Sequence, residues 1–260
     1  MPMRWITRRF PVFTALLLSC STQTPQNNHP DSEAHPVVAP EGPSDAGDQV
    51  GAPAAAGDRP WVVGENGQVA LTPPDRTGGL PLMQALAQRR SVRQFRSNPL
   101  PLRVLSELLW AAFGVNRDDG HRTAPSAWNG QEIDVYLAAE AGLFLYNAPA
   151  HYLDRVSTAD IRARTGTQGF VATAPINLIY VADFTRMRGS SDEERMVVAA
   201  ASAGAISENV YLYCASAGLA TVVRGSLDLA GLSQAMGLRP DQHLVLAQSV
   251  GYPGHAGVDR

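Results

Sequence analysis

The chain has 260 residues, of which 45% are hydrophobic and 17% are charged, a composition typical of a globular protein with one large core. All 21 basic residues are arginine, so chemistry that needs a lysine, such as a Schiff base or a P-loop, is excluded. The formal charge of -3 argues against a nucleic-acid partner. Cys20 and Cys214 are the only cysteines, which excludes a disulfide framework and any multi-cysteine metal site.

Residues 1–19 have the pattern of an export signal. Three arginines give a basic start, and the apolar residues 11–18 that follow are too few to span a bilayer. The segment ends in Leu17-Leu18-Ser19-Cys20, which resembles a bacterial lipobox; a signal peptide with an incidental cysteine is the alternative. We expect a lipoprotein with a lipid on Cys20, exported by the Sec or the twin-arginine route to the periplasmic or extracytoplasmic face of a membrane.

A composition change then separates a tether from a folded domain. Residues 20–60 contain seven Pro, four Gly, six acidic residues and no aromatic residue. Such a segment cannot bury enough apolar surface to offset the entropy of ordering, so it is predicted to be disordered. From Trp61 onward the composition is globular, and residues 61–260 are predicted to form one domain.

Two amphipathic helices are expected early in the domain. The first has an apolar face over residues 82–87, and its pattern ends at Arg89. The second begins after Pro101 and ends at Gly114. Its apolar face consists of Leu105, Leu108, Leu109, Ala112 and Phe113.

Strand patterns follow the two helices. Residues 133–138 alternate between apolar and polar, and residues 142–146 and 151–156 flank the turn 147–150 as a predicted hairpin. Residues 176–181, Ile-Asn-Leu-Ile-Tyr-Val, are apolar on both faces, which is typical of a central strand buried on two sides.

A long alanine-rich helix is predicted next. Ser191 and Glu194 form a capping box, and the helix is expected to end at Gly218. Its small residues would let another helix approach closely, so it is a candidate dimer element. Cys214 lies in an apolar run of this helix and is interpreted as a buried hydrophobic residue without chemistry. The remaining elements are a strand over 219–224, a helix over 229–236 closed by Gly237, and a strand over 244–250.

Several well-known catalytic motifs are absent: the sequence has no GxGxxG, GxxxxGK[ST], HExxH or GxSxG. The four histidines outside the tether lie far apart without acidic or cysteine neighbours at ligand spacing, so no metal site is expected.

Three arginines and a serine gather where the first predicted helix ends, at Arg89, Arg90, Ser91 and Arg93. Guanidinium groups can hold a doubly charged phosphate by forked, charge-assisted hydrogen bonds. The alternative is that cations are simply favourable at a helix C-terminus.

The run RRSVRQF at 89–95 resembles the motif that binds the FMN phosphate in the flavin-dependent nitroreductase family. Residues 123–131, TAPSAWNGQ, are similar to the PSxxNxQ loop of that family, although Glu132 stands where the family often has proline. Further segments fall in family order, so that the resemblance covers roughly residues 80 to 253: Thr173-Ala174-Pro175, Ser207-Glu208-Asn209, GLATVVRG at 218–225 and VGYP at 250–253.

The resemblance implies an α/β (α+β) nitroreductase-like fold, with a central, mostly antiparallel sheet flanked by helices. It also implies a homodimer around the alanine-rich helix, with FMN at the interface. Arg89, Ser91 and Arg93, with Arg90 close by, would contact the phosphate and ribityl chain of FMN. The ring would be contacted by the side chains of Asn129 and Gln131 and by backbone N–H groups of the segment Thr221, Val222, Val223, Arg224 and Gly225.

The implied activity is that of an FMN-dependent oxidoreductase. It would transfer electrons or hydride from NAD(P)H or another donor to a small organic acceptor such as a nitroaromatic or a quinone. No catalytic acid or base is named, because the cofactor carries the chemistry. The alternative is a non-catalytic flavin-binding module or a partner subunit of a membrane-associated redox system.

Overall fold

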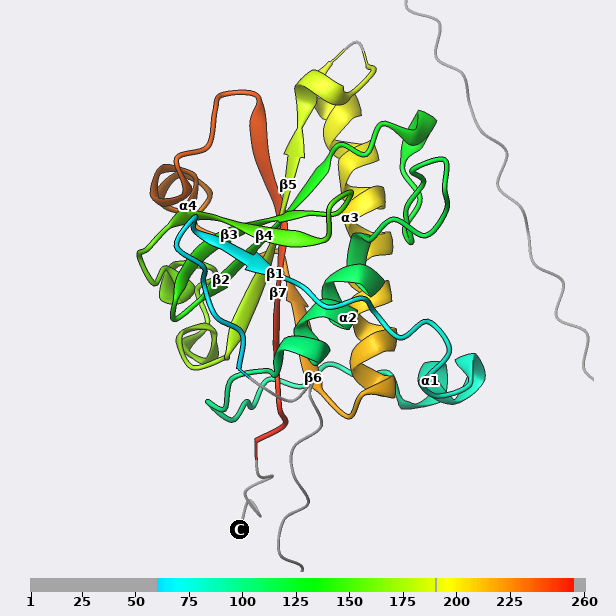
Figure 1. Ribbon diagram of the computed structural model, residues 1–260. Coiled ribbons are helices and arrows are strands. Elements are labelled where there is room, and N and C mark those ends of the chain that lie inside the picture. The colour runs from blue at the N-terminus through cyan, green and yellow to red at the C-terminus, as the bar shows by residue number, and fades with distance from the viewer. Residues whose placement is uncertain (1–59, 190, 255–260) are drawn as a thin grey trace, which may run out of the picture. The chain divides into compact units, whose positions relative to one another are not determined.

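A seven-stranded sheet with the strand order β1-β4-β3-β2-β5-β7-β6 forms the centre of the domain (Figure 1). The computed structural model describes residues 60–189 and 191–254, so the predicted signal peptide, Cys20 and nearly all of the tether lie outside the described residues. All paired strands in the described part run antiparallel. The predicted α/β fold with a largely antiparallel sheet is therefore confirmed.

The middle of the sheet consists of β2 (Ile133–Ala139), β5 (Ile176–Asp183) and β7 (Gln242–Gly251). β5 lies between the other two, and all eight of its residues are buried. This agrees with the prediction of a central strand, because a strand covered on both faces has no place for exposed polar side chains.

The predicted hairpin forms one side of the sheet. β3 (Gly142–Asn147) pairs with β4 (Tyr152–Ser157), and the short β1 (Gln68–Ala70) adds to β4 as an edge strand. Gly142 has φ = 128° and sits where a Cβ atom would collide with the backbone of Ser157, so only glycine fits at this turn.

Two long helices cover one face of the sheet. α2 (Leu102–Phe113) and α3 (Asp192–Ser216) bury their apolar residues against it in the larger core cluster. Ser191 caps α3 by accepting a hydrogen bond from the backbone N–H of Glu194, as the capping box predicts. Among the described residues, no helix is both long and apolar enough to cross a bilayer.

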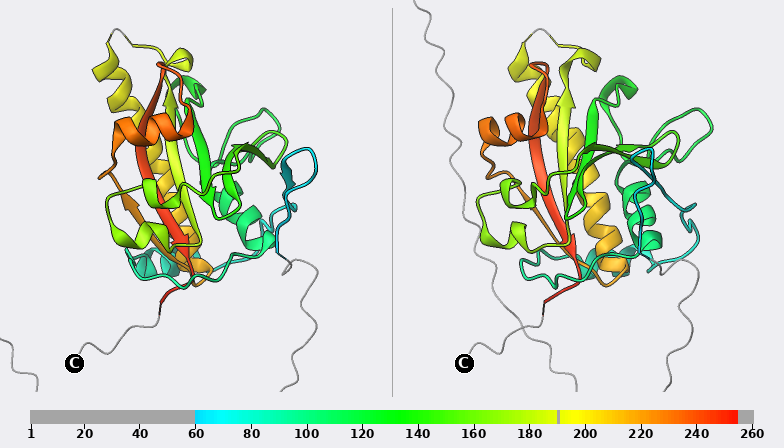
Figure 2. Two further views of the ribbon diagram at one scale, coloured as in Figure 1. Left: turned by 90° about the vertical axis from the view of Figure 1, so that its left-hand side faces the viewer. Right: turned by 60° about the vertical axis from the view of Figure 1, so that its left-hand side comes forward.

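The opposite face is covered by α4 (Leu229–Met236), as the side views show (Figure 2). Leu232 and Met236 of α4 pack in a second core cluster with residues of β2, β5 and β7. Gly237 ends the helix in the left-handed conformation, with φ = 66°. β6 (Ala220–Arg224) pairs only with β7, so its other edge faces the arginine-rich part of the chain.

α1 (Leu82–Gln88) is a helix as predicted, but its apolar face is not buried by the chain. Leu82, Met83 and Leu86 are 62%, 75% and 44% exposed, and Ala85 is the buried residue of this helix. α1 lies beside the C-terminal end of α3, where the backbone N–H of Leu80 donates to Ser216 Oγ at 2.7 Å (Figure 1). An exposed apolar face of this kind indicates a contact surface.

Candidate functional site

The arginine segment, residues 89–95, leaves α1 in an extended conformation and runs along the free edge of β6. Arg89 forms the C-cap of α1 through its backbone N–H, which donates to the Ala85 carbonyl. The backbone N–H of Val92 donates to the Thr221 carbonyl at 2.9 Å. The hydrogen bond to β6 thus fixes the predicted phosphate-binding residues beside the predicted ring-binding segment.

Tyr211 of α3 holds these two segments together. Its hydroxyl lies 2.8 Å from Ser91 Oγ and accepts a hydrogen bond from the backbone N–H of Val223 at 3.0 Å. Its ring lies 5.3 Å from the guanidinium carbon of Arg89, within cation–π range. No sequence pattern indicates this role, since Tyr211 stands in an apolar helical run that is typical of a buried helix face.

The arginine segment carries positive charge without acidic partners. Among the described residues, no carboxylate forms an ion pair with Arg89, Arg90 or Arg93. Arg89 and Arg90 line a cavity of about 350 Å³ whose wall also includes Tyr211 and Thr221. Three unpaired guanidinium groups within five residues, next to a cavity, make a site suited to an anion.

The β6 segment offers fewer free backbone groups than the sequence suggests. The backbone N–H of Val223 already donates to the Tyr211 hydroxyl, and the backbone carbonyl of Thr221 already accepts from Val92. The Thr221 side chain also has a partner, because it donates to the Ser249 carbonyl at 2.9 Å. Arg224 is 6% exposed, whereas Gly225 just beyond the strand is exposed. Gly225 is therefore the residue of this segment whose backbone is most open to a ligand.

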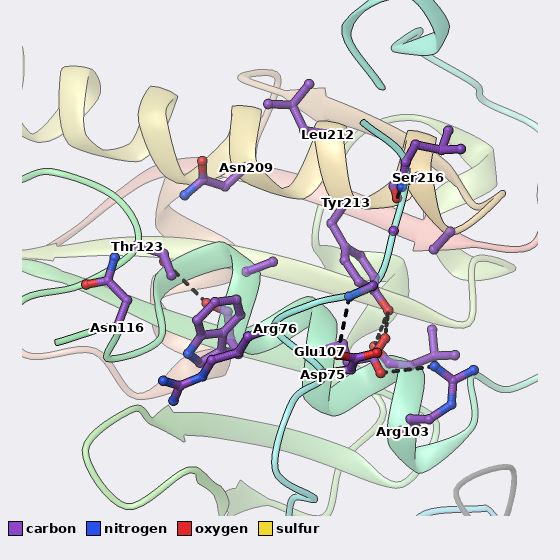
Figure 3. A pocket seen from close by; sticks show the side chains of 17 residues that line it. Asp75, Arg76, Arg103, Glu107, Asn116, Thr123, Asn209, Leu212, Tyr213 and Ser216 are labelled. Atoms are coloured by element: carbon purple, nitrogen blue, oxygen red, sulfur yellow. Dashed lines mark hydrogen bonds and ion pairs between the residues drawn. The ribbon is translucent and has the colours of Figure 1, made fainter. Parts of the chain in front are cut away.

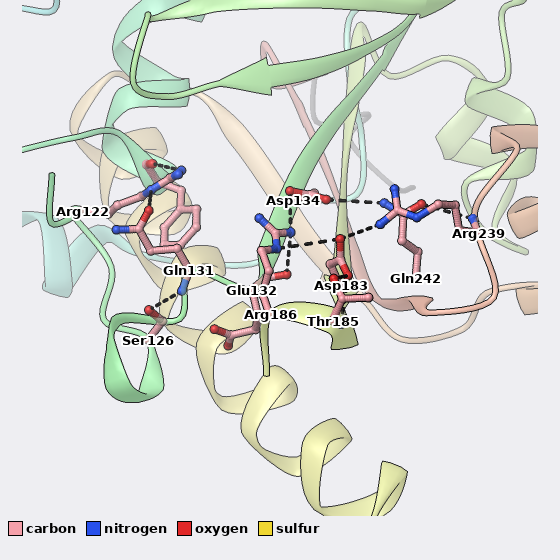
Figure 4. A network of polar contacts seen from close by, with 11 residues as sticks. Arg122, Ser126, Gln131, Glu132, Asp134, Asp183, Thr185, Arg186, Arg239 and Gln242 are labelled. Atoms are coloured by element: carbon pink, nitrogen blue, oxygen red, sulfur yellow. Dashed lines mark hydrogen bonds and ion pairs between the residues drawn. The ribbon is translucent and has the colours of Figure 1, made fainter. Parts of the chain in front are cut away.

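The predicted amide loop, residues 123–131, is held by hydrogen bonds within the loop and by one from Arg122 (Figure 4). The backbone N–H of Gln131 donates to Ser126 Oγ at 3.0 Å, and Arg122 Nε donates to Gln131 Oε1 at 2.8 Å. Gln131 Nε2 donates to Asn129 Oδ1 at 3.1 Å. The side chain of Gln131 thus stabilises the loop, whereas Asn129 is exposed on its surface.

The backbone of the amide loop is strained. Trp128, Asn129 and Gln131 have φ values of 53°, 52° and 48°, in the left-handed region that non-glycine residues rarely adopt. Trp128 is 66% exposed, and the guanidinium carbon of Arg188 lies 5.8 Å from its ring. Residues held in such conformations concentrate at functional sites, at a cost of roughly 1–3 kcal/mol each.

An ion-pair network anchors the end of the amide loop to the sheet (Figure 4). Arg186 Nη2 lies 2.7 Å from Asp134 Oδ1 and also donates to the Glu132 carbonyl at 3.1 Å. Arg239 pairs with Asp183 at 2.7 Å. Burial alone would raise the pKa of Asp183, but hydrogen bonds from Thr185 and the two arginines lower it below its ordinary value. Asp183 is thus ionised near neutral pH, and the network fixes where the chain passes from the loop into β2.

The arginine segment and the amide loop lie toward opposite ends of α3 (Figure 1). The arginine segment contacts Tyr211, whereas Trp128 of the loop shares a small cavity with Val198. At 1.5 Å per residue, Val198 and Tyr211 are about 20 Å apart along the helix axis. A single chain therefore does not bring the two predicted groups of flavin contacts together.

A second, larger cavity of about 570 Å³ lies between α2, α3 and residues 75–80 (Figure 3). On its wall, the Tyr213 hydroxyl donates to Glu107 Oε2 at 2.9 Å, and Arg103 Nη1 donates to Glu107 Oε1 at 3.0 Å. Burial and the adjacent carboxylate raise the pKa of Tyr213, so it stays a hydrogen-bond donor. None of the predicted flavin contacts lines this cavity.

Comparison with known proteins gives consistent matches. The family model described as "Nitroreductase family" matches residues 86–252. A candidate nitroreductase of Methanocaldococcus jannaschii is 33% identical over 155 residues, which are 56% of this chain and 78% of that protein. The crystal structure of a candidate nitroreductase from Ralstonia eutropha is 48% identical with a TM-score of 0.70, and the match covers 76% of this chain and 94% of the other. A candidate nitroreductase from Desulfovibrio desulfuricans, solved in complex with FMN, shares the fold at 22% identity, with a TM-score of 0.51 and coverage of 70% and 91%.

Proposed function

The chain belongs to the nitroreductase family of oxidoreductases, and from this premise we propose that it is an FMN-dependent oxidoreductase. It would pass electrons or hydride from a donor to a small organic acceptor such as a nitroaromatic or a quinone. Bound FMN would supply the electron-transfer chemistry, and the chain would supply binding, orientation and electrostatics. A relative of the same fold from Desulfovibrio desulfuricans holds FMN, which supports this choice of cofactor.

The arginine segment fits the phosphate end of FMN. Arg89, Arg90 and Arg93 have no carboxylate to neutralise them in the described part of the chain, so a dianionic phosphate would supply the missing charge. Ser91 Oγ would add a hydroxyl contact while Tyr211 holds its position. The cavity of about 350 Å³ beside these residues leaves room for part of the ribityl chain.

The free edge of β6 fits the ring. Gly225 is exposed just beyond the strand, and it has no side chain to keep a planar ligand away from the backbone. The hydrogen bonds from Val92 and Val223 hold this edge in place before any ligand arrives. A preformed backbone edge would orient the ring without a cost of ordering.

The active unit would be a homodimer, because one protomer keeps its phosphate-binding residues and Asn129 about 20 Å apart along α3. In a two-fold dimer with antiparallel α3 helices, the C-terminal end of one α3 lies beside the N-terminal end of the other. Asn129 of the partner subunit would then face the ring of a flavin whose phosphate is held by Arg89. This separation is the observation that carries the proposal of a shared site.

Exposed apolar residues occupy the two ends of α3 that such a dimer would join. Leu82, Met83 and Leu86 of α1 lie near its C-terminal end. Val197 and Trp128, which are 72% and 66% exposed, lie near its N-terminal end. A two-fold axis would place the α1 patch of each protomer against the Val197 and Trp128 patch of its partner. The dimer would then bury two copies of each patch.

The test is a titration of purified protein with FMN, followed by stopped-flow reduction. We expect a bound-flavin spectrum, and loss of the oxidised flavin absorbance on mixing with at least one donor among NADH, NADPH and a quinol. A subsequent pulse of a nitroaromatic or a quinone should restore the absorbance. Binding without reduction by any of the donors would favour the non-catalytic flavin-binding module instead, and absence of binding would remove the proposal.

A further inference from the structure

The cavity of about 570 Å³ between α2, α3 and residues 75–80 has the size of a small-molecule site (Figure 3). Such sites occupy roughly 300–1,000 Å³ and combine an apolar wall with a few well-placed polar groups. None of the predicted flavin contacts lines this cavity. Its polar groups therefore need an explanation apart from the flavin.

Arg76 is a cation on the wall of this cavity without an acidic partner. Its guanidinium carbon lies 5.1 Å from the centroid of the Trp110 ring. No carboxylate of residues 60–189 and 191–254 forms an ion pair with Arg76, and none of the hydrogen bonds there includes its guanidinium. A guanidinium held over an aromatic ring keeps N–H donors free at its edge, and these match the two oxygens of a carboxylate.

Asp75, the neighbour of Arg76 in sequence, is engaged elsewhere. Its Oδ1 accepts hydrogen bonds from the backbone N–H and from the hydroxyl of Thr77, both at 2.8 Å. These hydrogen bonds and the charge of Arg103 lower the pKa of Asp75. Asp75 thus stabilises the turn that carries Arg76 and leaves the guanidinium available to another anion.

Two asparagine amides line the cavity together with Arg76 (Figure 3). The side chain of Asn209 on α3 forms no hydrogen bond within the described part of the chain. Asn116 uses only its Oδ1, which accepts from Arg117 Nε at 3.2 Å, so its amide N–H groups are free. Unused N–H donors on three separate segments favour a ligand that carries negative charge and acceptor oxygens.

The carboxylate of Glu107, on the same wall, already has its partners. It accepts from the Tyr213 hydroxyl and from Arg103, which also balances its charge. Glu107 therefore does not call for a cationic ligand. The wall also has apolar members, which are Val104, Ala111 and Leu212.

We propose that this cavity binds an aromatic carboxylate, at a site separate from the flavin, with the carboxylate accepting hydrogen bonds from Arg76. The ring of the ligand would lie against the apolar members of the wall, and a polar substituent on the ring would contact the amide of Asn209. A rigid ring suits the cavity better than a flexible chain, because it loses less conformational entropy on binding. The site does not depend on FMN, since it shares no residue with the predicted flavin contacts.

The first test uses 2-naphthoate as the probe and 2-naphthamide as a neutral ligand of the same shape. Isothermal titration calorimetry measures both dissociation constants with and without added FMN. The parent should bind 2-naphthoate about tenfold or more tightly than 2-naphthamide in both states, the value of one charge-assisted contact. Arg76→Gln should bind the two about equally. The matched control is Arg164→Gln, because Arg164 is also exposed but does not line the cavity, and it should keep the preference of the parent.

Three results would overturn the proposal. The first is 2-naphthoate binding that is unchanged in Arg76→Gln. The second is binding that occurs only with FMN and shifts the flavin absorbance, because the probe would then lie at the flavin. The third is a parent that does not bind 2-naphthoate; a dimer mass that falls in Arg76→Gln would in that case identify a second copy of the chain as the occupant. FMN binding is titrated separately, so each of these results leaves the proposed function standing.

The second test concerns Asn209 and uses 6-hydroxy-2-naphthoate. The parent should bind this ligand several times more tightly than 2-naphthoate, because the hydroxyl gains a hydrogen bond to the amide, worth about fivefold or more. Asn209→Leu should lose this gain and keep the preference for 2-naphthoate over 2-naphthamide. Equal binding of the two naphthoates by the parent, or an unchanged gain in Asn209→Leu, would contradict the role of Asn209.

Discussion

At the scale of single residues, the proposed site depends on side chains that join segments distant in sequence. Tyr211 is the main example, because one hydroxyl contacts Ser91 of the arginine segment and the Val223 backbone of β6. Burial raises the pKa of the Cys214 thiol one turn further along α3, which is consistent with a packing residue rather than a reactive one.

Arg89→Ala should weaken FMN binding because it removes a guanidinium that lies over the Tyr211 ring and forms no ion pair with a carboxylate of residues 60–189 and 191–254. The loss of one charge-assisted contact is worth about 1.5–3 kcal/mol, so the dissociation constant should rise by about tenfold to a hundredfold. Titration of FMN by absorbance measures it. Arg155→Ala, at an exposed position on β4, is the matched control and should bind FMN as the parent does. An unchanged constant in Arg89→Ala would assign the phosphate to Arg90 and Arg93.

Asn129→Gly should leave FMN bound but slow its reduction about tenfold or more, because one hydrogen bond to a ring atom that gains charge is worth roughly 1–3 kcal/mol. Glycine is chosen because Asn129 has φ = 52°, which glycine adopts without strain. The reductive half-reaction in stopped flow measures the rate. Asn129→Ala serves as the comparison: if only the alanine variant were slow, backbone strain and not the amide would be the cause.

At the scale of elements, α1 and α3 carry the expected dimer contact. The apolar face of α1 is turned away from its own chain, and α3 exposes Val197 and small residues along part of its length. These surfaces have no explanation within one protomer. A second copy of the chain would cover them and, by the same symmetry, complete the flavin site.

Leu82→Arg should convert the dimer to a monomer and reduce flavin binding together with it, because a charge on the α1 face cannot be desolvated at the interface. Light scattering with and without FMN measures the mass, and a titration measures the binding. The matched control is Leu229→Arg on α4, because the Leu229 side chain is 56% exposed and the Leu82 side chain is 62% exposed. The control variant should remain dimeric. A monomeric parent that binds FMN tightly would contradict the shared site.

Local patterns predicted most elements of this fold, because each has a clear period and a clear end. The bounds of α4 and the cap of α3 follow from Gly237 and Ser191, which act within a few residues of themselves. β1, with three residues, is too short to show a period. The outward direction of α1 could not be predicted either, since periodicity identifies an apolar face but not what covers it.

Only those parts of the candidate site that consist of short sequence motifs could be predicted. The arginine segment and the amide loop are motifs, and both positions remain predictions until a ligand is measured. The contact of Gln131 with the ring stays a prediction, whereas its hydrogen bond from Arg122, nine residues earlier, is a contact that no motif indicates.

At the scale of the whole molecule, we propose that the domain is anchored outside the cytoplasm through Cys20, on the strength of Leu17-Leu18-Ser19-Cys20. Cys20→Ser should release the protein from the membrane fraction, because the lipid would have no thiol to attach to. Fractionation followed by a carbonate wash measures it, with Ser19→Ala as the control that keeps the cysteine. A Cys20→Ser protein that stays in the membrane fraction would contradict the anchor.

An FMN oxidoreductase site built from two protomers requires Arg89 and Asn129 from different chains, and mixing two variants tests this requirement. Arg89→Ala dimers should hold little flavin, and Asn129→Gly dimers should hold flavin that is reduced slowly. After the two are mixed and allowed to exchange subunits, the mixed dimers contain one intact site, with Arg89 from one protomer and Asn129 from the other. We predict that stopped flow will then show a fast phase of flavin reduction at the parental rate. A mixture that shows only the slow phase of the Asn129→Gly protein would contradict the claim.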